Sequence, residues 1–93
     1  MHVEIVSPEA TLYSGDATSV TVPGVDGQFQ MLDNHAPIVA LLEEGTVKIK
    51  GDIKINKAFQ NKFQKGKEAG EMLLLIQSGT VEMNDNKLIV LVE

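Results

Sequence analysis

Short runs in which apolar and polar residues alternate set the strongest limit on how this chain can fold. Valine, isoleucine and threonine, which favour strands, supply 22 of the 93 residues. A period of two gives a strand one face for the core and one face for water. The pattern is clearest at Val3 and Ile5, Val20 and Val22, Phe29 and Met31, and Val47 and Ile49, with Ser19 and Thr21 among the polar residues between them.

Glycine, proline, aspartate and asparagine separate these runs at regular intervals. We therefore expect turns at residues 7–9, 14–16, 23–27, 32–34, 43–45, 51–52 and 84–86. About eight to ten short strands at this spacing predict an all-β fold, a two-sheet β-sandwich or flattened barrel.

The length of the chain limits it to a single domain, residues 1–93. A chain of this size hides only about 60–65% of its unfolded surface, so nearly every apolar residue is needed for one core. The sequence has no cysteine, which excludes disulfides, cysteine-ligated zinc and a thiol nucleophile. A deep catalytic cleft is therefore not expected.

The N-terminus has no basic region followed by an apolar run, so we expect no secretory signal. The longest apolar runs, such as residues 72–76, are far shorter than the roughly twenty residues of a membrane span. Any association with a membrane would have to go through a partner.

The distribution of charge is uneven. The net charge of −5 argues against binding to nucleic acid, which depends on a basic surface. Seven of the eight cations nevertheless fall between Lys48 and Lys67, where Asp52 is the one acidic residue. Two interpretations of this lysine cluster are open. It is either a solvated edge that blocks aggregation between sheets or an electrostatic contact for an acidic partner.

The turn at Gly51-Asp52 can be tested against strand register, because residues that face each other across a hairpin point to the same side. A three-residue loop would pair Ile49 with Ile53 and Val47 with Ile55, and we prefer this hairpin. The alternative is one long strand over residues 46–56, with a bulge at Gly51, that pairs with residues 72–77.

The segment 57–70 is predicted to be either a short helix or a lysine-rich loop. Phe59 and Phe63 lie four residues apart, which would place them on one helical face, whereas the lysines and glycines near its end favour a loop. Residues 71–77 are continuously apolar in the middle, as in a strand covered on both faces. Residues 87–93 are expected to form the last strand.

No motif in the sequence predicts catalysis, a metal or a bound cofactor. His2 and His35 are the two histidines, and neither stands in a metal-ligand pattern or beside a suitable nucleophile. We expect His35 to be a loop histidine that hydrogen-bonds to backbone. Gly24 and Gly27 lack the lysine and helix of a phosphate loop, so they indicate a strand connection.

Read as a whole, the sequence resembles the epsilon subunit of the rotary ATP synthase. The resemblance covers nearly the full chain. It rests on the order and spacing of Ser7-Pro8, Tyr13-Ser14-Gly15, Gly24, Gly27, His35-Ala36-Pro37, Gly45, Ser78-Gly79 and Glu82. In that family the matching region is an N-terminal β-sandwich, which clamps the central gamma shaft and rests on the c-ring.

The resemblance implies two contact regions. The residues that match the c-ring contact are Pro23, Gly24, Val25, Asp26, Gly27 and Gln28, and those on the gamma-facing side are Ser7, His35 and Ala40. Ala36, Pro37, Gly45, Gly79 and Glu82 match structural positions of the family motif. With this resemblance, His35 is interpreted as an interface or turn residue.

The sequence also departs from the family pattern. Asp33 and Asn34 stand where proline and glycine are frequent, and Glu44 and Thr80 replace another proline and glycine. Residues 51–70 are longer than the usual hairpin and read as an insertion without an inherited role. No two-helix C-terminal domain follows, so ATP sensing and inhibition of hydrolysis are not expected.

The resemblance therefore implies a non-catalytic rotor subunit that links the gamma shaft to the c-ring and couples proton flow to ATP synthesis. It would lie peripherally at the cytoplasmic face of the membrane, with no cofactor, nucleotide or nucleic acid bound. Two alternatives remain open: a stand-alone ligand-binding β-sandwich with residues 23–28 as its lip, and a small hydrolase that uses His35.

Overall fold

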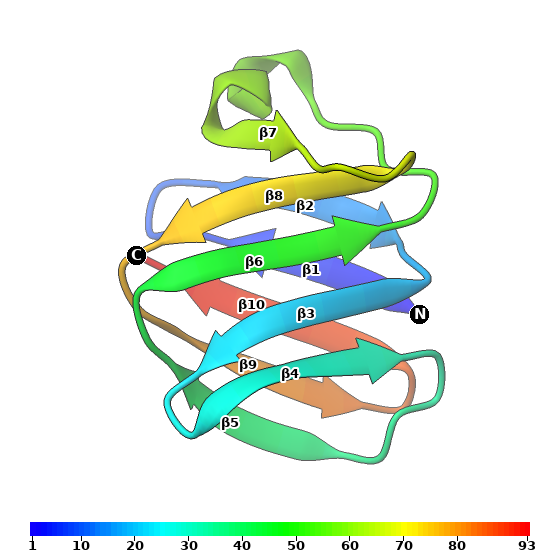
Figure 1. Ribbon diagram of the computed structural model, residues 1–93, viewed down its shortest axis with the longest axis vertical. Helices are drawn as coiled ribbons and strands as arrows, with labels where there is room; N and C mark the ends of the chain where they lie inside the picture. Colours follow the sequence, from blue (N-terminus) through cyan, green and yellow to red (C-terminus); the bar gives the residue numbers. More distant parts are fainter.

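Ten strands and one short helix make up the fold in the computed structural model, which describes residues 1–93 (Figure 1). In chain order they are β1 (His2–Val6), β2 (Thr11–Asp16), β3 (Ser19–Gly24), β4 (Gly27–Leu32), β5 (Ile38–Leu42), β6 (Gly45–Lys50), the 3-10 helix η1 (Lys57–Lys62), β7 (Phe63–Lys65), β8 (Glu71–Ile76), β9 (Gly79–Asn84) and β10 (Lys87–Val92). The predicted all-β class and the number of strands are confirmed.

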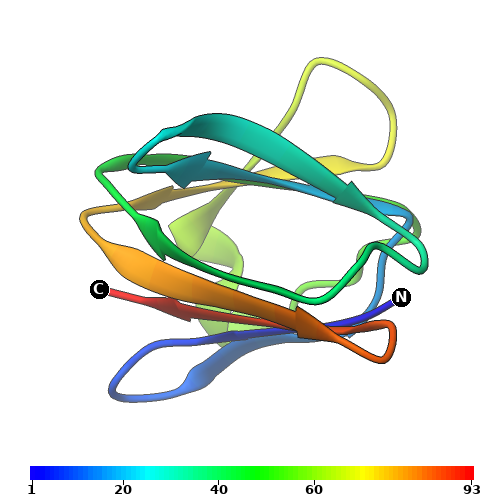
Figure 2. The same ribbon diagram turned by 90° about the horizontal axis from the view of Figure 1, so that it is seen from below.

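The strands form one curled sheet that folds over into two layers (Figure 2). The strand order is β2-β1-β10-β9-β5-β3-β6-β8-β7, and β4 pairs with β3 outside this path. One layer contains β2, β1, β10, β9 and β5, and the other contains β4, β3, β6, β8 and β7. Between β5 and β3 the sheet continues through a single residue pair, Gly24 with Leu42. The predicted sandwich is thus a sheet closed along one side.

Alternation along the strands produces a single core between the layers. Twenty buried apolar residues form one cluster, to which most of the strands contribute. The predicted inward residues Val3 and Ile5 of β1 are completely buried, and Val47 and Ile49 of β6 are almost so. Because both layers contribute side chains of period two, the core extends along the whole sandwich.

β3 departs from the predicted pattern of one buried and one wet face. Ser19 and Thr21 are buried, although their neighbours Val20 and Val22 already face the core. β3 lies between β4 and β6, with Ser19 opposite Lys50. The aliphatic stems of long neighbouring side chains can cover small polar residues in such a position.

The predicted hairpin at Gly51 is wrong. β6 ends at Lys50, and residues 51–56 form no strand, so the long strand over residues 46–56 is absent as well. β6 pairs instead with β8, which is the partner that the alternative interpretation gave, with Val47 opposite Leu74. The N–H of Gly51 donates to the carbonyl of Gly70 at 3.0 Å, and this bond closes the base of the intervening segment.

Residues 51–70 form an ordered cover rather than a free loop. The side chain of Asn56 accepts a hydrogen bond from the backbone of Ala58 at 2.9 Å and caps η1. The short helix that we considered is therefore present, but it ends at Lys62. Phe63 already belongs to β7, which pairs with the edge of β8, so Phe59 and Phe63 do not share a helical face.

The cover lies at the side of the sandwich where the two layers are not joined by strands (Figure 1). Phe63 is buried in the core cluster, and Ile53, Ile55 and Phe59 pack against that cluster. Residues 51–70 thus supply four apolar side chains to the interior. This segment therefore has a structural role that its lysine-rich sequence did not predict.

β8 is not covered on both faces, contrary to the prediction. Leu74 and Ile76 are buried, but Leu75 is 68% exposed. β8 lies in an outer layer of the sandwich, and no further layer covers its outward side. The last predicted strand is confirmed as β10.

We expect Phe63→Ala to lower the free energy of unfolding by about 3–5 kcal/mol, because it leaves a cavity where the insertion enters the core. Urea unfolding followed by circular dichroism measures the change. Gln64→Ala, on the exposed neighbour in β7, should stay within about 0.5 kcal/mol of the parent. A loss below about 1 kcal/mol for Phe63→Ala would show that the insertion does not help to hold the sandwich together.

Candidate functional site

An exposed apolar surface covers the outer side of β5, β9 and β10. On β5, Val39 is 74% exposed and Leu41 is 62% exposed. On β10, Ile89 and Leu91 are 38% and 49% exposed. The register of the two strand pairs arranges the surface in two rows, Ile89-Glu82-Val39 and Leu91-Thr80-Leu41. We call these six residues the apolar face.

The apolar face arises because β5 is apolar at every position and β10 is apolar at every position after Lys87. Ile38, Ala40 and Leu42 of β5 pack against or belong to the core, so the residues between them must point outward. β10 behaves in the same way, with Leu88, Val90 and Val92 buried. Large apolar side chains that gather on one outer face are typical of a surface for a partner.

The sequence contains a signal for this face, although it does not identify the face by itself. Residues 38–42 and 88–92 are uninterrupted apolar runs in a chain whose other strands mostly alternate. A fully buried strand would give the same pattern, so the runs alone do not say which side is exposed.

One end of the apolar face opens into a groove of about 680 Å³. Its walls come from five separate segments of the chain. The lining residues are Val6, Ser7, Pro8, Val25, Leu41, Leu42, Ser78, Gly79, Thr80, Leu91, Val92 and Glu93. The groove thus joins the apolar face to the β3–β4 hairpin and to the turn between β1 and β2.

The residues predicted for the c-ring contact form the tip of the β3–β4 hairpin. Gly24 pairs with Gly27, and Val25 and Asp26 are the exposed residues of the turn. A Cβ atom on Gly24 would lie 2.7 Å from the carbonyl oxygen of Gly27, so the tight turn requires glycine there. Pro23 and Gln28 form the next pair of the hairpin.

The hairpin tip is held against β5 by backbone hydrogen bonds. The N–H of Val25 donates to the carbonyl of Leu41 at 3.0 Å, and the N–H of Glu43 donates to the carbonyl of Pro23 at 2.9 Å. Gly45 supports the same contact, because a Cβ atom there would approach the Cβ of Pro23 to 2.7 Å. These contacts join the tip directly to β5, which carries Val39 and Leu41 of the apolar face.

The three residues predicted to face gamma lie at different places. Ser7 is half-buried in the β1–β2 turn, where its hydroxyl donates to the carbonyl of Ala10 at 3.2 Å, and it lines the groove. His35 lies before β5, at the opposite end of the apolar face. Ala40 packs against the core from the inner side of β5, so Val39 and Leu41 carry the exposed surface beside it.

His35 is a loop histidine bonded to backbone, as predicted. Its ring Nδ1 lies 2.7 Å from the carbonyl oxygen of Ala36, and its backbone N–H donates to the carbonyl of Leu32 at 3.1 Å. The preceding Asn34 has a φ of 63°, a conformation that asparagine tolerates better than most residues. Asparagine can therefore stand where the resembling family often has glycine.

The other residues of the family motif have local structural positions. Ala36 and Pro37 are exposed in the segment that leads into β5. Gly79 begins β9, where a Cβ atom would lie 2.2 Å from the carbonyl oxygen of Leu91, so glycine lets β9 and β10 approach. Glu82 is exposed within the apolar face.

The ionisable groups form no candidate metal site. No group of three or more histidine, cysteine, aspartate or glutamate side chains could hold a metal ion. The Nε2 of His2 lies 3.5 Å from a carboxylate oxygen of Glu4, in an exposed pair.

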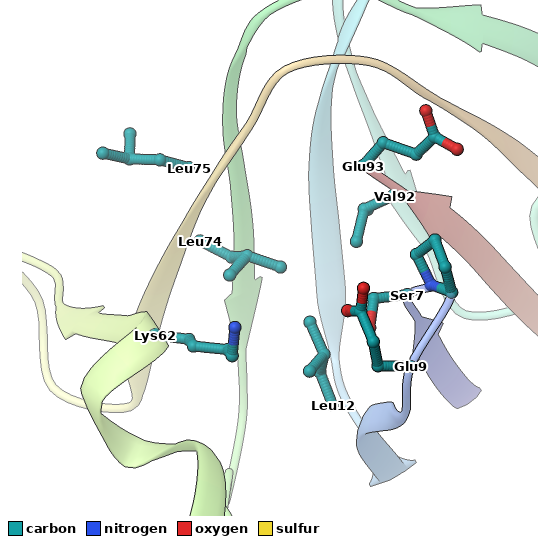
Figure 3. Close-up of a pocket in the computed structure, with 9 residues that line it drawn as sticks. Ser7, Glu9, Leu12, Lys62, Leu74, Leu75, Val92 and Glu93 are labelled. Carbon is teal, nitrogen blue, oxygen red and sulfur yellow. The ribbon is translucent and has the colours of Figure 1, made fainter.

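A second, smaller cleft of about 430 Å³ lies beside the groove (Figure 3). Its apolar lining includes Leu12 and Leu74, and Lys62 of η1 enters it from the insertion. Glu9 and Glu93 line the same cleft. Because this open cleft contains both a lysine and two glutamates, its charges favour neither an anionic nor a cationic ligand.

The lysine cluster is partly neutralised by the chain itself. Lys50 forms an ion pair with Glu68, and the Nζ of Lys48 lies 3.8 Å from Glu71. The remaining lysines of the cluster lie outside these pairs, and Lys65 stands on the edge strand β7. A charged edge strand discourages pairing with other chains, so this placement favours the solvated-edge interpretation.

The family model that describes the beta-sandwich domain of the ATP synthase delta/epsilon chain matches residues 1–93. The chain therefore belongs to this family. It is 37% identical over 93 residues to the ATP synthase epsilon chain of Sulfurimonas denitrificans, and this match spans the whole chain but 60% of that relative. It is 35% identical over 91 residues to the epsilon chain of Chlorobium limicola, covering 98% of this chain and 86% of the relative.

The fold also agrees with a solved assembly. A chain in the central stalk and c-ring structure of the Tetrahymena thermophila mitochondrial ATP synthase superimposes with a TM-score of 0.67 at 17% identity. The match covers 99% of this chain and 62% of that chain. No helix here has the length and hydropathy that a membrane span would need.

The ion pair between Lys50 and Glu68 gives a prediction about pH. Its hydrogen bond and charge lower the pKa of Glu68 from 4.5 and raise the pKa of Lys50 from 10.5. The pKa of Glu68 is lower in the folded than in the unfolded chain, so its ionised carboxylate stabilises the fold. This stabilisation is complete above the ordinary glutamate pKa and is lost as pH falls through the lowered pKa. In Lys50→Gln the pKa of Glu68, measured by NMR titration, should rise. An unchanged pKa would mean that the pair does not persist in solution.

Proposed function

We propose that this chain is a non-catalytic rotor subunit in the central stalk of a proton-translocating ATP synthase. The observation that carries the proposal is the apolar face, found on a β-sandwich whose sequence matches the delta/epsilon family from end to end. The relatives named above are epsilon chains, and the solved assembly is a central stalk with its c-ring.

The apolar face is proposed to bind the gamma shaft. It is bounded by Ser7 at the groove end and by the His35 loop at the other, the two exposed or half-exposed residues that the resemblance assigns to gamma. Val39, Leu41 and Leu91 would supply most of the apolar contact. Ala40 would act from within by allowing β5 to pack closely on the core.

The hairpin tip, residues 23–28, is proposed to rest on the c-ring. Val25 is 49% exposed at the turn, and the backbone bonds to Leu41 and Glu43 fix the tip to β5. A force applied at the tip would therefore reach the apolar face through the sheet without a flexible joint. This rigidity is what a coupling element between two rotating partners requires.

In this role the chain performs no bond-making of its own. It would couple proton flow to ATP synthesis by holding gamma and the c-ring together, and would need no nucleotide or cofactor. Membrane association would come through the complex, at the cytoplasmic face in a bacterium. The alternative of a stand-alone ligand-binding module is not favoured, because the matching relatives are ATP synthase chains.

Leu41→Asp should weaken binding to the gamma subunit by at least about 30-fold, because it places a charge in the centre of an apolar contact. Leu75→Asp is the matched control, since Leu75 is 68% exposed against 62% for Leu41 but lies on β8 in the other layer. Its affinity should stay within about twofold of the parent. Calorimetric titration with purified gamma measures both. Equal losses, or none, would contradict the placement of gamma on the apolar face.

A separate test concerns the hairpin tip. Val25→Ser with Asp26→Ala should reduce association with detergent-solubilised c-ring by about tenfold while gamma binding is preserved, because the two contacts lie on different parts of the sandwich. Surface plasmon resonance with immobilised c-ring measures the effect. If c-ring association is unchanged while Leu41→Asp abolishes it, the ring contact belongs to the apolar face and not to the tip.

A further inference from the structure

Glu82 is the one ionisable residue of the apolar face. Cross-strand register places it between Ile89 on β10 and Val39 on β5, which are 38% and 74% exposed. Thr80, two residues earlier on the same strand, has Leu91 and Leu41 as its neighbours. A carboxylate therefore stands at the centre of one of the two rows of the apolar face, whose other residues are aliphatic or carry a hydroxyl group.

The chain itself provides no partner for this carboxylate. The five ion pairs of the structure involve other acidic residues, namely Asp33, Glu4, Asp16, Glu71 and Glu68. Other charged or titratable groups share the outer side of this layer, among them Asp16, which lies opposite His2. Lys87 lies diagonally across from Glu82, opposite Asn84, and Glu4 and His2, which pair with each other, lie on β1 beyond Ile89.

A partner that covers the apolar face cannot avoid Glu82. The exposed residues Val39 and Ile89 flank it on both sides, so contact with this row removes water from the carboxylate. An ionised group that loses water without gaining a counter-charge costs several kcal/mol. That cost is comparable to the gain from several apolar side chains, so the partner must compensate the charge for the apolar contact to be productive.

We propose that Glu82 determines specificity at this surface by pairing with a lysine or arginine of the bound partner. The partner's matching surface is then apolar with one cation near its centre. This inference rests on the proposed function, because it takes gamma as the occupant of the apolar face. It adds the chemistry by which the occupant is recognised, since a partner without that cation would leave a buried charge unpaired.

The test compares gamma binding of Glu82→Gln with that of Asp85→Asn by calorimetric titration. Gln keeps the shape of Glu82 but removes its charge, and should weaken binding by at least about 30-fold. Glu82→Lys should weaken it further by bringing two cations together. Asp85→Asn removes one negative charge from the exposed β9–β10 turn, where φ is 50°, and should change affinity less than twofold. Thermal unfolding checks that every variant remains folded.

Lys87→Gln, alone and combined with Glu82→Gln, identifies the source of the counter-charge. If the cation belongs to the partner, the two substitutions act independently. If Lys87 swings across to neutralise Glu82, both single variants lose the same affinity and the double variant loses no more, which would overturn the inference.

The remaining outcomes separate this inference from the proposed function. If Leu41→Asp abolishes gamma binding while Glu82→Gln binds equally well or more tightly, the function stands and the cation is absent. If the parent chain does not bind gamma at all, the proposed function fails and the inference fails with it.

Discussion

The structure depends on the two-residue period of strands in a chain with room for only one core. Ten strands curl into two layers, and the inward side chains of both layers fill the space between them. Most strands meet this requirement with alternating residues, so that their outward side chains are polar. β5, β8 and β10 do not, and what β5 and β10 leave exposed is the surface on which the proposed function rests.

Large aliphatic residues serve both stability and the proposed recognition in this protein. Whether such a residue serves one or the other depends on whether its side chain points into the core or out of the layer. Leu42 and Leu41 are neighbours in β5, yet one is buried in the core and the other is 62% exposed. Changing Leu41 should therefore affect contact with a partner far more than it affects folding. Glu82 then gives the exposed surface a preference, because an aliphatic face alone would accept many apolar partners.

Rigidity is provided mainly by backbone contacts. Gly24, Gly45 and Gly79 each stand where another chain segment approaches to a distance that a Cβ atom would obstruct. The bonds from Val25 and Glu43 tie the hairpin to β5. A small sandwich with these contacts suits the proposed role of passing force between two partners. Residues 51–70 add Phe63 to the core on the side where the two layers are not joined by strands.

The sequence by itself determined the β class, the positions of most strands, the backbone-bonded state of His35 and the family. These depend on local pattern, turn chemistry and motif spacing, which a chain carries with it. Pairing across the Gly51 turn, the ordered cover over residues 51–70 and the exposure of Leu75 were decided only by tertiary structure. Which strands pair depends on which segments the fold brings to a free strand edge. Whether an apolar strand is buried on one face or on both depends on whether another layer of the fold covers its outer face. The apolar face has the same origin. The sequence of residues 38–42 and 88–92 shows that both faces of these strands are apolar, but only the two-layered fold determines that one of those faces is exposed.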